Sequence, residues 1–301
     1  MTPEELLSPE SILRASPEDA DRILDRLERS VPVRPGVVEL SHRGTSEALV
    51  FGDSHGDWRS ILEVRAEFLR DGADPRCLVG LGDYVDRVPD DCGPGSVVNA
   101  LLLLDLAARF PDRVVLIQGN HETVSRIPVL PRSLAEEVDE LWGPLAERYA
   151  RLSALLERGP LAAISSSGAY LAHAGFPRGA LPASWRRVFE EPDEERLVEI
   201  VWTEPEASRL RRGAGVPWTA RELGEFLRTT GLSVFLRGHD PDLNGRPIYD
   251  GRCLTLHTTR VFERYGGVLV ARLPLERPVR TVADVRVDHL ASEGRSYPAP
   301  D

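Results

Sequence analysis

Residues 48–57 read Ala-Leu-Val-Phe-Gly-Asp-Ser-His-Gly-Asp, an apolar run that stops at a cluster of glycine, carboxylate and imidazole groups. The same order of apolar run and polar cluster returns at 78–87 and at 114–122. Short apolar runs that end in glycine, aspartate or asparagine are typical of buried strands. Helical patterns at 58–70 and 96–109 separate the three runs, so this succession predicts a parallel sheet with crossover helices.

The rest of the chain is expected to add helices and a second group of strands, with no linker between domains. Residues 1–30 show helical patterning with two capping serines, and residues 132–158 show it with a break at Gly143-Pro144. A further helix is predicted at 220–228. The strands expected in this second half lie at 161–164, 169–172, 234–236, 253–256 and 268–272.

The charge of the chain restricts the classes of function. All 37 basic residues are arginine, the 301 residues contain no lysine, and the formal net charge is −11. The absence of lysine excludes a lysine Schiff base and a phosphate-binding loop that ends in Gly-Lys-Ser. The acidic balance disfavours nucleic acid and anionic membranes as partners. If phosphate is a substrate, arginine side chains or metal ions must supply the positive charge.

Cysteine usage and the N-terminal residues indicate the compartment. The three cysteines are an odd number without paired spacing, which fits a reducing environment. The first residues lack the basic-then-apolar order of a signal peptide. The richest apolar stretch, 100–108, is too short to span a bilayer. We therefore expect a cytoplasmic protein, and the oligomeric state stays open.

The polar residues after the predicted strands have the donor types of a metal site. Asp53 and His55 are two residues apart on an extended backbone, so both side chains point the same way and can hold one ion. Asp83 has two carboxylate oxygens and can bridge two ions. Later strands end in histidines at 173–175 and 237–239. Imidazole, carboxylate and amide donors suit manganese, iron or zinc, and paired ions about 3.5–4 Å apart serve in-line displacement at phosphorus.

Five motifs, taken together and in order, resemble a known family. They are GDSHG (52–56), GDYVDR (82–87), GNHE (119–122), HAG (173–175) and RGH (237–239). The set is similar to the calcineurin-like metallophosphoesterases and, more narrowly, to bacterial members of the phosphoprotein phosphatase family of serine/threonine phosphatases. The resemblance implies an α/β fold with a central β-sandwich of two mixed sheets flanked by α-helices. We accordingly expect an N-terminal helical segment at 1–46 packed on the core, a catalytic domain at 47–272, and a strand or extended tail at 273–301.

The resemblance also implies a role for ten residues at matching motif positions. Two divalent metal ions, with manganese expected and iron or zinc as alternatives, would be held by Asp53, His55, Asp83, Asn120, His173 and His239. Asp83 would bridge the ions. His121 would be the general acid, and Asp86 would orient it. Arg87 and Arg212 would bind the substrate phosphate. The register of the loop around Arg212 is open, so Arg211 is an alternative to Arg212. Arg87 could instead pair with Asp86 or with a surface acid.

The activity implied by the resemblance is hydrolysis of phosphoserine or phosphothreonine, or else of phosphotyrosine, in a protein or peptide by attack of a metal-bridging hydroxide. The local charge permits this reaction. Two divalent ions, two carboxylates and a hydroxide together leave about one positive charge. Two arginines raise the charge to about three, which can hold a phosphate dianion. The first alternative is a dinucleoside polyphosphate hydrolase or another small-molecule phosphoesterase, against which Asp86 and Glu122 argue. Pro241 stands where phosphodiesterases and nucleases carry a second histidine. A catalytically inactive binding module of the same fold is the second alternative.

Two features depart from the family pattern, and one further histidine needs an interpretation. Val88 stands where glycine is usual and opens a loop, residues 88–96, whose role stays open. The segment after Cys253 lacks the family's Ser-Ala-Pro-Asn-Tyr stretch, so we do not expect sensitivity to toxins that bind the groove formed by that stretch. His257 follows a predicted strand and could lie beside the metal ligands, but the family position is not a ligand. We therefore expect His257 to be a packed histidine.

Overall fold

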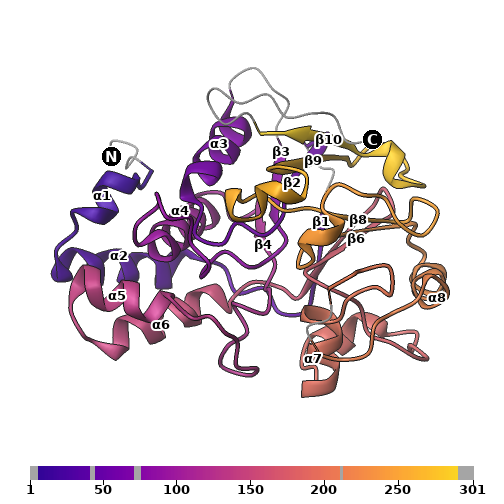
Figure 1. Ribbon diagram of the computed structural model, residues 1–301, viewed down its shortest axis with the longest axis horizontal. Helices are drawn as coiled ribbons and strands as arrows, with labels where there is room; N and C mark the ends of the chain where they lie inside the picture. Colours follow the sequence, from indigo (N-terminus) through magenta and orange to yellow (C-terminus); the bar gives the residue numbers. More distant parts are fainter. Residues whose placement is uncertain (1–5, 41–44, 71–75, 211–212, 291–301) are drawn as a thin grey trace.

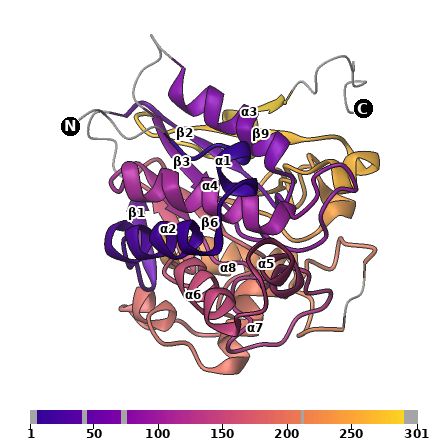
Figure 2. The same ribbon diagram turned by 90° about the vertical axis from the view of Figure 1, so that its left-hand side faces the viewer.

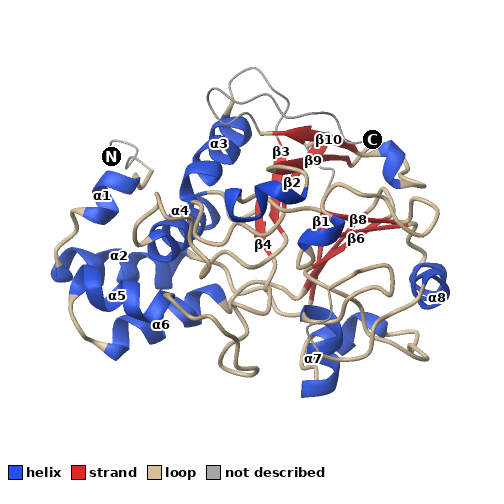
Figure 3. Ribbon diagram, in the orientation of Figure 1, coloured by secondary structure: helices blue, strands red, loops and turns tan. Residues whose placement is uncertain are grey.

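The computed structural model describes residues 6–40, 45–70, 76–210 and 213–290, which form two stacked β-sheets with helices on their outer faces (Figures 1 and 3). The first sheet contains, in spatial order, β10 (Arg286–His289), β9 (Leu269–Pro274), β2 (Glu47–Phe51), β3 (Arg76–Gly80) and β4 (Val114–Leu116). The second sheet contains β1 (Val37–Leu40), β5 (Ala162–Ser165), β6 (Ala169–Ala172), β7 (Val234–Arg237) and β8 (Cys253–Thr255).

Both sheets are mixed, as the family resemblance implied. In the first sheet β2, β3 and β4 are parallel, whereas β9 runs antiparallel to β2 and to β10. In the second sheet β5 and β6 are antiparallel, β1 pairs in parallel with β5, and β6, β7 and β8 are parallel to one another. The predicted parallel arrangement of β2, β3 and β4 is confirmed, and it brings the carboxyl ends of these strands to one edge of the sheet.

Apolar side chains fill the space between the two sheets. Alternate residues of the strands point into this layer and are buried there, such as Val50, Val79, Leu171, Leu236 and Ala271. The opposite faces of the inner strands are buried as well, whereas the edge strands β1 and β10 stay partly exposed. Because both faces of the inner strands are covered, these strands have nearly continuous apolar sequences, which is the pattern that made them visible in the sequence.

Helices surround α4 (Gly95–Arg109) on the outer face of the first sheet. The crossover helix α3 (Trp58–Leu69) lies beside it, and α1 (Pro9–Leu13), α2 (Pro17–Ser30), α5 (Leu134–Trp142) and α6 (Ala146–Leu156) complete this layer (Figure 2). Every residue from Gly95 to Ala107 is buried, which fits the mostly apolar sequence of α4. Ser8 and Ser16 cap α1 and α2, as predicted.

A second, smaller layer covers the outer face of the other sheet. It consists of α7 (Glu194–Val201), α8 (Ala220–Thr230) and the 3₁₀ helix η1 (Trp185–Phe189), which bury apolar side chains against β5, β6 and β7. Three further 3₁₀ turns are η2 (Pro241–Leu243), η3 (Arg260–Tyr265) and η4 (Val282–Asp284). Among the described residues, no helix has both the length and the apolar character needed to cross a bilayer.

The structure differs from the sequence-based expectation at two elements. β1 lies within the N-terminal segment that we expected to be helical, and it forms an edge strand by parallel pairing with β5. No strand was predicted there because only four residues pair, and their partner lies far along the chain. The helix α7 was not predicted either, although Asp193 caps it and its acidic first turn suits a helix N-terminus.

Candidate metal centre

Four donor atoms converge at the end of β6, and all four belong to predicted metal-binding residues. The Nε2 atom of His173 lies 2.9 Å from Asn120 Oδ1, 3.1 Å from His239 Nδ1 and 3.3 Å from Asp83 Oδ1. All four residues are buried. Two ligands that each lie about 2.1 Å from one ion are roughly 3 Å apart when they meet at a right angle, so this spacing fits a shared cation.

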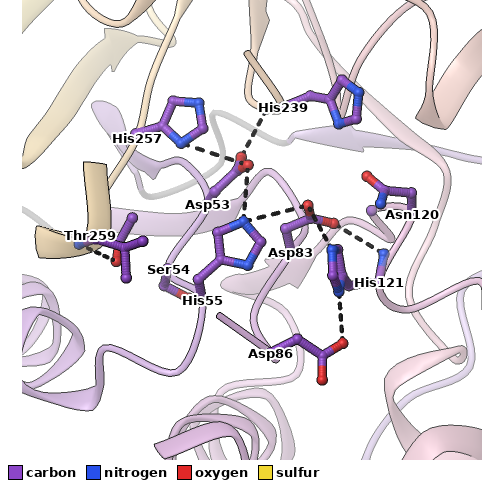
Figure 4. Close-up of polar contacts among 12 residues, drawn as sticks. Asp53, Ser54, His55, Asp83, Asp86, Asn120, His121, His239, His257 and Thr259 are labelled. Carbon is purple, nitrogen blue, oxygen red and sulfur yellow. Dashed lines mark hydrogen bonds and ion pairs between the residues drawn. The ribbon is translucent and has the colours of Figure 1, made fainter. Parts of the chain in front are cut away.

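A second group of donors lies next to the first and shares Asp83 with it (Figure 4). The Nε2 atom of His55 lies 3.7 Å from Asp53 Oδ2 and 3.7 Å from Asp83 Oδ2. Ligands of one ion can be separated by up to about 4.2 Å, so each of these two distances from His55 is short enough for a shared cation. Asp83 presents Oδ1 to one group and Oδ2 to the other, which is the arrangement that a bridging carboxylate requires.

Backbone carbonyls orient two of the imidazoles. The Nδ1 atom of His55 is 3.1 Å from the carbonyl oxygen of Val85, and Nδ1 of His173 is 2.9 Å from that of Leu81. With the proton on Nδ1, each ring donates to its carbonyl and leaves the Nε2 lone pair directed at the other donors. A histidine that binds a metal is typically oriented by such a second hydrogen bond.

The motif loops hold strained backbone conformations. Positive φ angles occur at His55 (41°), Asp83 (56°), Asp86 (64°), Arg87 (51°) and His239 (71°). Left-handed backbone is unfavourable for residues with a Cβ atom, and such strain persists only where the surroundings enforce it. Here the strained turns lie directly after β2, β3 and β7, where they direct the side chains toward one another.

The charges of these buried groups are strongly coupled. Burial lowers the pKa of His55 to about 3, so this imidazole is neutral and ready to bind a cation at neutral pH. Burial also disfavours the charged form of His173, but the negative charge of Asp83 outweighs it and raises the pKa of His173 to about 9. The pKa of Asp83 is in turn held well below its usual range, against the effect of burial, mainly by His173 and His121. A cation bound beside His173 must therefore displace a proton.

His121 and Asp86 form a hydrogen-bonded pair beside the two donor groups. The Nδ1 atom of His121 is 2.6 Å from Asp86 Oδ2, and the other oxygen of Asp86 accepts hydrogen bonds from the backbone N–H groups of Ser133 (2.7 Å) and Leu134 (3.0 Å). The Nε2 atom of His121 lies 4.0 Å from Asp83 Oδ2, so it faces the donor groups. Burial opposes the charged form of His121, but Asp83 and Asp86 together raise its pKa.

Glu122 fixes the relative positions of two motif loops. Its Oε2 atom accepts from the backbone N–H groups of Asp83 (2.7 Å) and Gly119 (2.8 Å), and its Oε1 atom accepts from that of Tyr84 (2.8 Å). Burial, followed by the charge of Asp83, raises the pKa of Glu122 to about 7. No positioning role was predicted for Glu122, although its place in the GNHE motif was a signal for one.

Of the two predicted phosphate-binding arginines, only Arg87 can be placed. It is half-buried, and its buried Nε atom donates no hydrogen bond to a described residue. The contacts of Asp86 with described residues are with His121, Ser133 and Leu134, and no ion pair between Asp86 and Arg87 is found there. Arg212 and its alternative Arg211 lie outside the described residues.

The loop at 88–96 is held by an arginine that sequence reasoning missed. Arg260, in η3, donates from Nη2 to Asp57 Oδ1 at 2.8 Å and from Nη1 to Asp91 Oδ2 at 2.7 Å. By the resemblance described above, this segment stands where the family is expected to have its Ser-Ala-Pro-Asn-Tyr stretch. It carries Phe262, whose ring meets the imidazole of His55 edge-on at a centroid distance of 5.6 Å. The substituted segment is therefore a wall of the candidate site.

Comparison with known proteins identifies the family. The sequence profile of the calcineurin-like phosphoesterases matches residues 47–243, which hold all five motifs. The chain belongs to this family. Calcineurin-like phosphoesterases use divalent metal ions, and two buried clusters of this chain have donor atoms close enough to hold one: Asp83 with His173 and His239, and Asp83 with His55 and His121.

Relatives of this calcineurin-like phosphoesterase include protein phosphatases. A probable serine/threonine-protein phosphatase of Encephalitozoon cuniculi is 28% identical over 258 residues, which are 81% of this chain and 54% of that protein. The serine/threonine-protein phosphatase 4 catalytic subunit of Kluyveromyces lactis is 29% identical over 216 residues, 69% of this chain and 67% of that protein. The match therefore spans about half of the first relative and two thirds of the second.

Solved structures confirm the phosphoesterase fold. A protein serine/threonine phosphatase from Saccharomyces cerevisiae superposes with a TM-score of 0.70 at 20% identity, over 95% of this chain and 91% of that one. A cold-active protein-tyrosine phosphatase of a Shewanella species superposes with a TM-score of 0.54 at 14% identity, over 87% and 84% of the two chains. At these identities the likeness shows the fold alone, which is the predicted sandwich of two mixed sheets.

Replacing Gly238 with alanine should weaken metal binding at Asp53. A Cβ atom on Gly238 would lie 2.1 Å from Asp53 Oδ1, the oxygen that accepts a hydrogen bond from the backbone N–H of His239. The carboxylate must move, and we expect the affinity for Mn²⁺ to fall about tenfold or more in equilibrium dialysis. Gly224→Ala is the control, because the space around this helical glycine is open. Unchanged affinity in Gly238→Ala would argue against Asp53 as a ligand.

Proposed function

We propose that this chain is a metal-dependent phosphomonoesterase that hydrolyses phosphoserine and phosphothreonine in proteins or peptides. One observation supports the proposal most strongly. Two donor groups share Asp83, and the imidazole of His121 faces them. The pair of His121 and Asp86 gives a proton donor 4.0 Å from the shared carboxylate. In-line hydrolysis of a phosphate ester needs this combination of positive charge, an activated water and a proton for the leaving oxygen.

The proposed metal ligands divide into two sets. The first ion would be held by Asp53, His55 and Asp83, and the second by Asp83, Asn120, His173 and His239. Bound divalent ions would neutralise charge on the phosphoryl group and lower the pKa of a water molecule. Manganese is the proposed metal, with iron and zinc as alternatives, because carboxylate, amide and imidazole donors suit all three.

The chain's own residues then bind the phosphate and move the proton. Arg87 would bind the phosphate through its guanidinium, which suits planar bidentate contacts with phosphate oxygens, and Arg212 is proposed for the same role. His121 would donate a proton from Nε2 to the departing alkoxide. Asp86 holds the His121 ring by its Nδ1–H group and, with Asp83, raises the pKa of His121, which favours the protonated imidazole.

A steady-state comparison of substrates tests the proposed class. With Mn²⁺ supplied, we expect kcat/KM for phosphoserine and phosphothreonine peptides to exceed that for diadenosine tetraphosphate by about tenfold or more, since Asp86 and His121 are arranged to protonate an alkoxide. A phosphotyrosine peptide of the same sequence measures the third specificity. Preferential cleavage of the dinucleotide would move the protein to the polyphosphate hydrolases, and failure to cleave any substrate with two ions bound would favour an inactive binding module.

A further inference from the structure

His257 is fixed beside Asp53 by hydrogen bonds of its own backbone and of the next residue. The residue follows β8 and forms an isolated parallel β-bridge with Asp53. Its backbone N–H donates to Asn244 Oδ1 at 2.8 Å, its carbonyl accepts from Leu269 N at 2.8 Å, and the next residue, Thr258, donates to the carbonyl of Asp53 at 2.9 Å. His257 is completely buried, as expected for a packed histidine. Its ring nevertheless lies at the candidate site.

The distance between the two side chains distinguishes a hydrogen bond from a shared ion. The Nδ1 atom of His257 lies 3.6 Å from Asp53 Oδ2, and the close-up shows this nitrogen directed at the carboxylate (Figure 4). N–H···O hydrogen bonds are about 2.7–3.2 Å long, so 3.6 Å is too far for one. Two ligands about 2.1 Å from one ion are roughly 3.6 Å apart when they subtend 120° at the metal. The spacing therefore suits an ion between the two atoms.

The same aspartate oxygen has the same relation to His55. His55 Nε2 lies 3.7 Å from Asp53 Oδ2, nearly the distance found for His257. The ring of Phe262 meets both imidazoles edge-on, at centroid distances of 5.6 Å for His55 and 5.3 Å for His257. The two rings thus share one aromatic neighbour and one carboxylate oxygen, the Oδ2 atom of Asp53, which belongs to the proposed first metal position.

We propose that His257 is a further protein ligand of the first metal ion, together with Asp53, His55 and Asp83. This assignment rests on the proposed binuclear centre. It gives the first ion four protein ligands, as many as the second, and a second imidazole among them. Imidazole nitrogen favours zinc, iron or cobalt over manganese, so His257 would raise the affinity and the selectivity of the first position for these metals.

Cobalt binding tests the assignment without relying on turnover. The variants are His257→Phe, which keeps a buried ring but removes both nitrogens, and His257→Gln, which keeps a polar side chain of similar length. His289→Phe, in β10, is the matched control because His289 lies outside the donor groups. Co²⁺ affinity is measured by visible absorption. Proton NMR of the Co²⁺ form counts the shifted N–H resonances of metal-bound imidazoles, and thermal unfolding reports whether each variant folds.

We expect the unmodified chain to bind two Co²⁺ ions. In His257→Phe, the Co²⁺ affinity of one site should fall by about tenfold or more, and one shifted imidazole resonance should disappear. His257→Gln should lose the same resonance, which keeps the test valid if the phenylalanine variant does not fold. An unchanged number of shifted resonances in either folded variant, with or without weaker binding, would overturn the assignment. If the unmodified chain bound no Co²⁺, the proposed metal centre itself would be wrong, whereas two ions bound equally well by all variants would reject His257 alone.

Discussion

Replacing Asp83 with asparagine should remove both metal ions and lower kcat by about a thousandfold or more. Asp83 presents one oxygen to each donor group, with Oδ1 3.3 Å from His173 Nε2 and Oδ2 3.7 Å from His55 Nε2. Asparagine keeps the size of the side chain but loses the negative charge and one of the two oxygen donors. Metal ions contribute several kcal/mol of transition-state stabilisation in such reactions, which corresponds to this loss in rate.

Metal content after gel filtration, measured by elemental mass spectrometry, and kcat on a phosphothreonine peptide check the expectation. The control is Asp105→Asn, because Asp105 in α4 is equally buried and pairs with Arg26 away from the donor groups. That variant should lose stability and keep both its ions and its turnover. An Asp83→Asn protein that retained two ions and a rate within tenfold of the original would exclude Asp83 as the bridging ligand.

The strands that carry the site could be predicted because their signals are local. The apolar run at 48–51 and the polar motif after it correspond to β2 (Glu47–Phe51) and its loop, and the run at 78–81 corresponds closely to β3. Once three such strands were expected to be parallel, the convergence of their polar ends followed from the geometry of the sheet. The predicted donors from these loops lie together in the structure, although predicting them required no knowledge of which distant segments pair.

The surroundings of the site could not be predicted because they depend on distant pairing. Arg260 meets Asp57 and Asp91, which lie 203 and 169 residues earlier in the chain. A lone arginine after a strand gives no sign of such partners. His257 was expected to be a packed residue, and it is buried, but its position beside Asp53 arises from a β-bridge between the two sheets. β1 was missed for the same reason, since its partner β5 decides that it is a strand.

Replacing His121 with asparagine should lower kcat on phosphoserine peptides by about 10²- to 10⁴-fold while leaving both metal sites filled. The alkoxide of serine is a poor leaving group, so its departure requires the proton that His121 Nε2 would donate. A phenyl phosphate with a strongly acidic phenol needs no such help and should lose less than about tenfold. Steady-state kinetics on both substrates, with metal content measured in parallel, provide the comparison.

Asp86→Asn separates the proton donor from the residue that orients it. Asp86 accepts from His121 Nδ1 at 2.6 Å, and its charge, with that of Asp83, raises the pKa of His121 against the effect of burial. Removing that charge lowers this pKa, so the protonated acid is lost at a lower pH and the alkaline fall in kcat should begin earlier. The position of His121 is kept, because asparagine can still accept its hydrogen bond. Equal losses on both leaving groups in His121→Asn, together with an unshifted pH profile in Asp86→Asn, would show that His121 acts through substrate or metal positioning and that the proton comes from elsewhere.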